Sequence, residues 1–198
     1  MAFKKRMKKG VFTWSEAKTV AFDTPPPTLK LQLHLWKRAG EIVAVRRGVY
    51  GFTDSIPETE EILKALYPPC YVSLESALSI HGLIPDVPFA TTGVTTRPSR
   101  NFSTPWGTFI FRRLKSEAFK GFDPKTLIAF KEKAVVDYLF FSRRRFGNEK
   151  SPWQERRWQN LRGFNFRRAR KYARAFGSGQ LTRLIGGLED YATTHDVD

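Results

Sequence analysis

The segment at residues 28–39 has two competing hydrophobic periods. Every second position between 29 and 35 is leucine, which is the period of a strand. Leu29, Leu33 and Trp36 also follow the i, i+4, i+7 spacing of a helix face. A helix is favoured because leucine, lysine and glutamine are good helix formers and no β-branched residue lies among them. Gly40, placed just after two cations, is typical of a helix end.

A hairpin is predicted after this helix. Residues 41–45 and 49–52 are rich in β-forming side chains, and the turn between them contains Arg46, Arg47 and Gly48. Residues 23–27 are predicted to form a turn that separates the helix at 28–39 from an earlier helix. Helix, turn, helix and hairpin within about 50 residues is the order of a winged helix-turn-helix, a DNA-binding fold.

The N-terminal residues contain the signals for that earlier helix. Thr13 and Glu16 have the spacing of a capping box, so a helix should begin there. Its buried face is expected to contain Trp14, Ala17, Ala21 and Phe22. Residues 1–9 form either a short helix or a basic arm.

Helical and strand patterns are mixed along the rest of the chain. Helices are predicted at 58–67, 73–80, 132–141, 154–161, 165–176 and 180–191, with frayed residues from 193, and strands at 89–95, 108–114 and 126–130. Glycines at 177, 186 and 187 are expected to separate the last helices. The sequence therefore predicts an α+β protein with a winged helix-turn-helix at 1–53, an α+β domain at 54–142 and basic helices at 143–198 packed on that domain.

Charge changes this picture because it is concentrated at the two ends. The net charge of the 198 residues is +15. Residues 1–53 carry 11 Lys and Arg against 3 Asp and Glu, residues 54–142 carry 10 against 10, and residues 143–198 carry 13 against 6. An excess of this size indicates a polyanionic partner, although it also increases solubility. A neutral middle between basic ends predicts two separate surfaces for nucleic acid.

The same composition excludes several classes of site. No apolar run of about 18 residues is present to span a membrane, and no secretory signal follows the basic N-terminus. Cys70 is the only cysteine, and the histidines at 34, 81 and 195 are scattered, so neither a disulfide nor a zinc site is expected. The sequence predicts a cytoplasmic protein without metal or other cofactor.

Four motifs resemble the AbiEi family of antitoxins from the AbiE abortive-infection toxin–antitoxin systems. They are LxxWKRAGEIVAVRRGVYGF at 33–52, YVSLESALSIHGLI at 71–84, TPWGTFIFRRL at 104–114 and EKAVVDYLFF at 132–141. The resemblance covers nearly the whole chain in the family's order. This chain departs from the pattern at Phe130-Lys131, where the family commonly has a small residue and proline, and in its short first helix.

The resemblance implies an autorepressor that is not an enzyme. In the family, an N-terminal winged helix binds inverted repeats at the promoter of its own operon, which implies two copies or a homodimer on the DNA. The C-terminal part counteracts a toxin that resembles nucleotidyltransferases. Such systems are described as type IV, in which direct contact between antitoxin and toxin is not required.

Candidate DNA contacts lie on the second helix and at the hairpin turn. Arginine side chains suit phosphates and narrow minor grooves, and most contacts of a DNA-reading helix are to phosphates. The predicted DNA-binding residues are Thr28, Lys30, His34, Lys37, Arg38, Arg46 and Arg47. Leu31 and Leu35 fall on the same outward face, where leucines more often pack against another protein surface.

A second basic surface is predicted in the C-terminal helices. Its members are Arg143, Arg144, Arg145, Arg167, Arg170, Lys171 and Arg174, and aromatic residues lie between them in the sequence. Aromatics beside cations stack nucleobases in some proteins, but at helical spacing they usually form core. An RNA-binding module that uses this surface is the alternative function.

Three other features have plain structural interpretations. Ser73 is expected to cap a helix, and His81 to lie at the end of that helix. Asp86 and the sequence Asp123-Pro124-Lys125 resemble the skeleton of a PD-(D/E)xK nuclease. A turn is the better interpretation, because proline is a poor residue for the central strand that such a nuclease needs.

Overall fold

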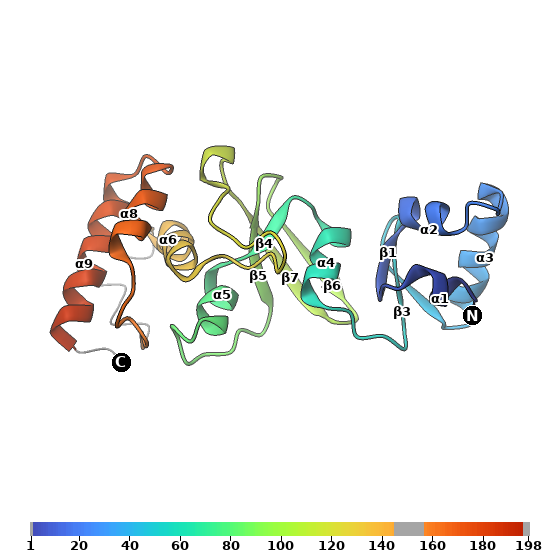
Figure 1. The fold of residues 1–198 in the computed structure, drawn as a ribbon, viewed down its shortest axis with the longest axis horizontal. Helices are drawn as coiled ribbons and strands as arrows, with labels where there is room; N and C mark the ends of the chain where they lie inside the picture. The colour runs from blue at the N-terminus through green and yellow to red at the C-terminus, as the bar shows by residue number, and fades with distance from the viewer. Residues whose placement is uncertain (1, 145–156, 196–198) are drawn as a thin grey trace. The chain divides into compact units, whose positions relative to one another are not determined.

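The computed structural model describes residues 2–144 and 157–195 (Figure 1). Helices and strands are mixed along the chain, so the predicted α+β class is confirmed. The chain divides into two compact units. Unit 1 consists of Met1–Pro68 and Ser103–Trp106, and unit 2 of Pro69–Phe102 and Gly107–Asp198.

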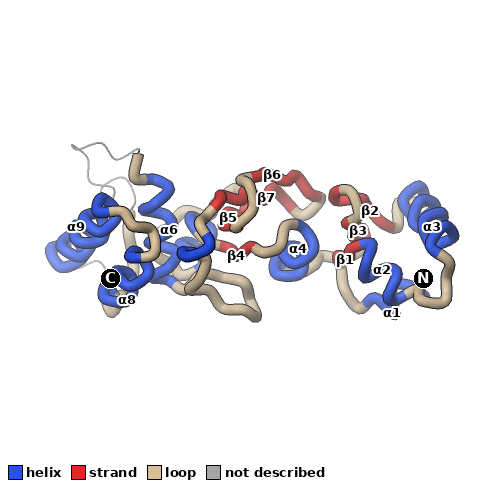
Figure 2. Tube along the Cα trace, turned by 90° about the horizontal axis from the view of Figure 1, so that it is seen from above, coloured by secondary structure: helices blue, strands red, loops and turns tan. Residues whose placement is uncertain are grey.

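Unit 1 contains a small sheet with helices on both sides. Its elements are α1 (Ala2–Met7), β1 (Val11–Thr13), α2 (Trp14–Val20), α3 (Pro26–Arg38), β2 (Ile42–Arg46), β3 (Val49–Phe52) and α4 (Thr59–Leu66). The antiparallel strands have the order β1-β3-β2. In Figures 1 and 2, α1, α2 and α3 lie on one side of the strands and α4 on the other.

The core of unit 1 collects side chains from all three helices on the first side and from every strand. Its buried members are Phe3, Met7, Phe12, Ala17, Ala21, Leu29, Leu33, Ile42 and Phe52. Residues 1–9 therefore do not form a loose arm, since α1 buries Phe3 and Met7 in this core. The capping box of α2 is present as predicted, but Phe22 is 83% exposed, so its assignment to the buried face was wrong.

Residues 28–39 are helical, and the alternation of leucines does not produce a strand. Leu29 and Leu33 are buried, while Leu31 and Leu35 remain exposed. The helix ends in a Schellman motif, in which Gly40 N–H donates to Lys37 O (3.1 Å) and Glu41 N–H donates to Trp36 O (3.0 Å). Gly40 adopts φ +73°, a left-handed conformation that explains why glycine follows the helix.

The predicted hairpin is formed by β2 and β3, with Gly48 at φ +76° in the turn. The ladder pairs Ala44 with Tyr50 and then Arg46 with Val49, so β2 contains a bulge at Val45. β1 was not predicted because a three-residue strand is too short for a hydrophobic period to be visible. β1 pairs with β3, so β3 is the central strand of a three-stranded sheet and β2 is one of its edge strands.

Unit 1 extends beyond the boundary expected at residue 53. α4 belongs to this unit because the backbone N–H of Gly10 donates to Glu61 Oε2 (3.1 Å) and α4 packs near β1. The boundary between the first segment of unit 1 and unit 2 therefore lies after α4, at Pro68.

Unit 2 is built around a four-stranded sheet of order β4-β5-β7-β6. Its elements are β4 (Cys70–Val72), α5 (Leu74–Ile80), β5 (Thr91–Thr95), β6 (Arg100–Thr104, whose end lies in unit 1), β7 (Gly107–Arg113), the short 3-10 helix η1 (Ser116–Ala118), α6 (Lys131–Ser142), α8 (Phe166–Arg174) and α9 (Gly179–His195). β4 and β5 are antiparallel, whereas β5 and β7 are parallel. α6 lies between α5 on one side and α8 and α9 on the other (Figure 1).

Several expected elements of unit 2 differ from the structure. Residues 126–130 form only isolated bridges, Val72 with Ile128 and Phe122 with Ala129. The helix predicted at 154–161 falls partly outside the described residues, and 157–161 are not helical. α9 continues through Gly186 and beyond residue 193 to His195, because packing of its apolar face outweighs the cost of helical glycine.

Candidate nucleic-acid interface

The outward face of α3 is polar and cationic. Thr28, Lys30, His34, Lys37 and Arg38 are all exposed, as the helical spacing predicts once Leu29 and Leu33 face the core. Lys30 Nζ lies 5.9 Å from the centre of the Trp14 ring, so this cation is directed toward α2. The other cations, Lys37 and Arg38, lie in the last turn, next to the helix carbonyls that favour positive charge.

The two arginines of the hairpin have different surroundings. Arg46 Nη2 donates to the backbone carbonyl of Ala65 (3.4 Å), near the C-terminal end of α4. The bulge in β2 immediately precedes Arg46, and bulges commonly redirect the neighbouring side chains of a strand. Arg47 is exposed in the turn itself, and Gly48 O accepts a hydrogen bond from Trp14 N (2.8 Å), which fixes the turn beside α2. Arg46 is the last residue of β2 and Arg47 lies in the turn, and both are exposed.

Three cations near the N-terminus, two of them in α1, form ion pairs. Lys4 pairs with Asp54 (2.5 Å), Arg6 with Asp23 (3.4 Å) and Lys9 with Glu16 (2.5 Å). Within residues 2–144 and 157–195, no ion pair is formed by the cations of α3 and the turn, which are Lys30, Lys37, Arg38 and Arg47. The cations of α3 and of the hairpin turn are therefore not neutralised by these ion pairs, and among the described residues of unit 1 the same holds for Lys5, Lys8 and Lys18.

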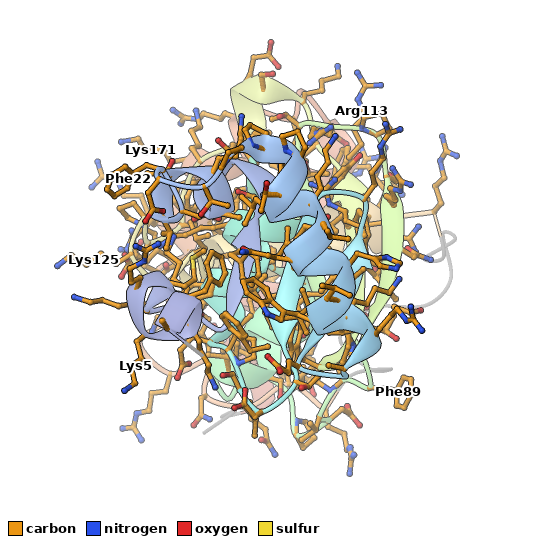
Figure 3. The ribbon with its side chains drawn as sticks, turned by 90° about the vertical axis from the view of Figure 1, so that its right-hand side faces the viewer. Lys5, Phe22, Phe89, Arg113, Lys125 and Lys171 are labelled. Atoms are coloured by element: carbon orange, nitrogen blue, oxygen red, sulfur yellow. The ribbon has the colours of Figure 1, made fainter. Side chains whose placement is uncertain are left out.

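Apolar side chains are exposed beside the same cations. Leu31 and Leu35 are 58% and 50% exposed, and Phe22 projects from the turn after α2. Figure 3 looks onto α3 and shows Phe22 and Lys5 extending outward from neighbouring parts of unit 1. An interface on this face would therefore combine phosphate-binding cations with apolar contacts.

The second basic surface is only partly assembled as predicted. Arg167, Lys171 and Arg174 are exposed on α8, whereas Arg170 faces α9 and forms an ion pair with Glu189. Arg143 and Arg144 follow α6, and Arg143 donates to Phe140 O and lies over the Phe140 ring. Arg145 lies outside the described residues.

A buried polar cluster in unit 2 was missed by the sequence reasoning. Lys133 and Asp137, one turn apart on α6, form an ion pair in which both side chains are 0% exposed. Tyr71 Oη (3.0 Å) and Ser73 Oγ (2.8 Å) also donate to Asp137 Oδ2. Ser73 occupies the N-cap position of α5 as predicted, but its hydroxyl donates to Asp137 and makes no cap hydrogen bond.

Burial governs the protonation of this cluster. Burial raises the pKa of Asp137, and the hydrogen bonds from Lys133, Ser73 and Tyr71 oppose that rise. Burial also raises the pKa of Tyr71, with further contributions from the charge of Asp137 and its hydrogen bond. The cluster joins β4, the start of α5 and α6, and its fully buried side chains indicate a structural role. The i, i+4 spacing of Lys133 and Asp137 within an apolar helix was the available sequence signal.

The remaining polar candidates are structural in their contacts. His81 Nε2 lies 2.7 Å from Ala129 O, at the C-cap of α5. Asp123 Oδ1 accepts from Lys125 N–H (2.7 Å), which is the turn predicted for that sequence. Asp86 lies 3.6 Å from Arg157. Among the described residues, no group of three or more His, Cys, Asp and Glu side chains is placed to hold a metal ion, and no helix is long and apolar enough to cross a bilayer.

Comparison with known proteins does not assign the chain to a family. No family model matches the sequence, and no curated protein matches it.

Proposed function

We propose that this protein is a DNA-binding transcriptional repressor in which unit 1 acts as a winged helix-turn-helix. The observation that carries the proposal is the element order α1-β1-α2-α3-β2-β3 with strand order β1-β3-β2. In this arrangement α3 takes the place of the recognition helix and the β2–β3 hairpin that of the wing.

The charges of unit 1 support that assignment. The exposed side chains of α3 include Lys37 and Arg38, which form no ion pair with described residues, and Arg47 is exposed at the hairpin turn. As α3 enters the major groove, Thr28, Lys30 and His34 would reach phosphates or base edges. Arg47 would contact a phosphate or the adjacent minor groove. Leu31 and Leu35 would meet thymine methyl groups or a second copy on an inverted repeat.

The biological role rests on the resemblance of the four sequence motifs to AbiEi antitoxins. We infer that the repressor controls its own operon and counteracts a nucleotidyltransferase-like toxin in phage defence, without enzymatic activity of its own. Three of the motifs lie in large part in unit 2 and include the buried side chains Ser73, Lys133 and Asp137. Antitoxicity is therefore assigned to unit 2.

DNA binding is tested with a labelled duplex that contains the promoter upstream of the gene. Arg47→Ala is expected to weaken binding several-fold and to reduce the slope of log K against log salt by about 0.9, because one phosphate contact is lost. Arg183→Ala is the control, since Arg183 is an exposed arginine of α9 in unit 2. Equal salt slopes for wild type, Arg47→Ala and a Lys37→Ala/Arg38→Ala variant would contradict the proposal.

The antitoxin role is tested separately by co-expression with the product of the adjacent gene. Growth arrest by that product, relieved by the full chain and by the Arg47→Ala variant alike, is the expected result. If the neighbouring product is harmless, or if the full chain fails to relieve its toxicity, the antitoxin assignment is wrong even when DNA binding is retained.

A further inference from the structure

Two grooves on unit 2 are lined by cations and meet at one residue. The first has a volume of about 650 Å³ and follows α8, where Arg167, Arg168, Lys171 and Arg174 line it. The second has a volume of about 1070 Å³ and is lined by Arg174 as well. Arg174, at the end of α8, therefore joins the two grooves into one track.

The second groove brings together cations from three distant parts of the sequence. Arg113 and Lys115 come from the end of β7, Arg143 follows α6, and Arg174 ends α8. Among the described residues that line the two grooves, Glu117 is the one carboxylate. The seven cations of the track are Arg113, Lys115, Arg143, Arg167, Arg168, Lys171 and Arg174. Such an imbalance favours a ligand with several negative charges.

Arg168 is held in place by its neighbours. Its guanidinium lies 3.7 Å from Glu132, donates to Tyr172 Oη (3.2 Å) and stacks over the Phe130 ring at 4.6 Å. Arg170, in contrast, is neutralised by Glu189 on the other side of α8. Arg168 and Arg170 are thus each paired with a carboxylate, and the cations of α8 that line the grooves without an ion pair to a described residue are Arg167, Lys171 and Arg174.

Aromatic rings lie among the cations in both grooves. Tyr172 lines the first groove, and Phe140 and Phe176 line the second, with ring centres 4.5 Å apart. Arg143 lies 3.8 Å from the centre of the Phe140 ring. Rings and guanidinium planes next to a row of cations suit a strand whose bases are unstacked and available, whereas the bases of a duplex are stacked inside it. The Asp and Glu side chains of an acidic peptide would supply negative charge but no aromatic base to stack on these rings.

We propose that the track on unit 2 binds single-stranded nucleic acid, with its phosphates on the cations and one or more bases against Tyr172, Phe140 or Phe176. Arg167 and Arg174 are seven residues apart, so α8 alone presents cations over about 10 Å. The site is separate from the duplex-binding face proposed for unit 1, and it does not depend on operator binding.

The test measures binding of labelled 12-nucleotide oligo(U) and oligo(dT) to the full chain by fluorescence anisotropy over a salt series. Arg167→Glu/Lys171→Glu should lower affinity at least ten-fold and reduce the magnitude of the salt slope by about 1.4, because two phosphate contacts are lost. Arg112→Glu/Arg183→Glu is the matched control, since it makes the same change of charge at exposed arginines of unit 2 that do not line the track. Its affinity should change less than two-fold.

Binding of either oligonucleotide supports the proposed site. Stronger binding of oligo(U) would identify RNA as the preferred ligand, and stronger binding of oligo(dT) would identify single-stranded DNA. Absence of binding to both would overturn the proposal. It would also be overturned by equal losses in the track variant and its control, or by loss only in the unit 1 variant Lys37→Glu/Arg38→Glu. Promoter binding by the track variant, measured alongside, separates this outcome from failure of the repressor function.

Discussion

Replacing Lys133 with methionine tests the energetics of unit 2 most directly. Lys133 and Asp137 are both fully buried, and the Lys133 ammonium also lies 4.7 Å from the centre of the Phe176 ring. Methionine retains most of the unbranched apolar part of the side chain but removes the charge. The Asp137 carboxylate is then left buried with hydrogen bonds from only Tyr71 and Ser73.

The expected loss follows from that uncompensated charge. Removal of one partner of a buried ion pair costs about 3–5 kcal/mol. The lower end, about 3 kcal/mol at pH 7, is expected here because two hydroxyl donors remain. Loss of the cation raises the pKa of Asp137 further above its unfolded value of about 3.9. The folded variant then retains a proton that the unfolded chain loses, so its stability falls as the pH rises above 3.9, and its deficit is smaller at pH 5 than at pH 7.

Cys70 provides the assay, because it is the only thiol of the chain and is buried in β4 of unit 2. Its accessibility to a thiol reagent, measured in pulses along a urea titration, reports the unfolding of that unit. The companion variant Lys133→Met/Asp137→Asn removes both charges and keeps an amide oxygen that accepts from Tyr71 and Ser73. It should recover at least half of the loss. A single variant within about 1 kcal/mol of wild type at both pH values, or a double variant no more stable than the single, would refute the reasoning.

Three further predictions concern other residues. Burial raises the pKa of Cys70 to about 12. At pH 8 the native thiol should therefore react with a disulfide reagent at least about 1000-fold more slowly than the thiol of the chain unfolded in urea, and comparable rates would show that β4 is exposed. Thr13→Ala should cost unit 1 about 1 kcal/mol by circular dichroism melting. Although partial burial raises the pKa of Glu16, hydrogen bonds from Lys9 and Thr13 keep that pKa below its usual value. The stability that Glu16 contributes through the capping box should therefore be lost as the pH falls through the lowered pKa, and a Glu16→Gln variant should not show this loss. Arg46→Ala should leave the salt slope of promoter binding within about 0.3 of wild type, because Arg46 is engaged with Ala65 O, and a change equal to that of Arg47→Ala would contradict this contact.

Local signals were sufficient to predict most of unit 1. The capping box at Thr13, the glycine after α3 and the β-rich segments around Gly48 act through residues close in sequence, so each could be read directly. β1 and β4 are three residues long and exist because of pairing with distant strands, which no local period reveals. Phe22 was misplaced because the helix ends at Val20 and the following turn directs the ring outward.

Candidate site residues were predictable by type but not by their contacts. Exposure of the cations on α3 follows from helical spacing once the buried face is known. The hydrogen bond of Arg46 with Ala65 O and the ion pair of Arg170 with Glu189 each join residues 19 positions apart, and sequence spacing alone did not indicate them. The meeting of Arg113, Arg143 and Arg174 in one groove likewise depends on the tertiary fold.

The burial of α6 on all sides determines how this protein can be dissected in experiments. α5 packs on one side of α6, and α8 and α9 cover the other, with Lys133 among the enclosed side chains. A shortened chain that ends after α6 would expose apolar surface and a charged pair to water, and it would be expected to aggregate or be degraded. Loss of antitoxicity in such a truncation would therefore report a failure to fold. Point substitutions at exposed residues of α8 are the appropriate means of assigning its function.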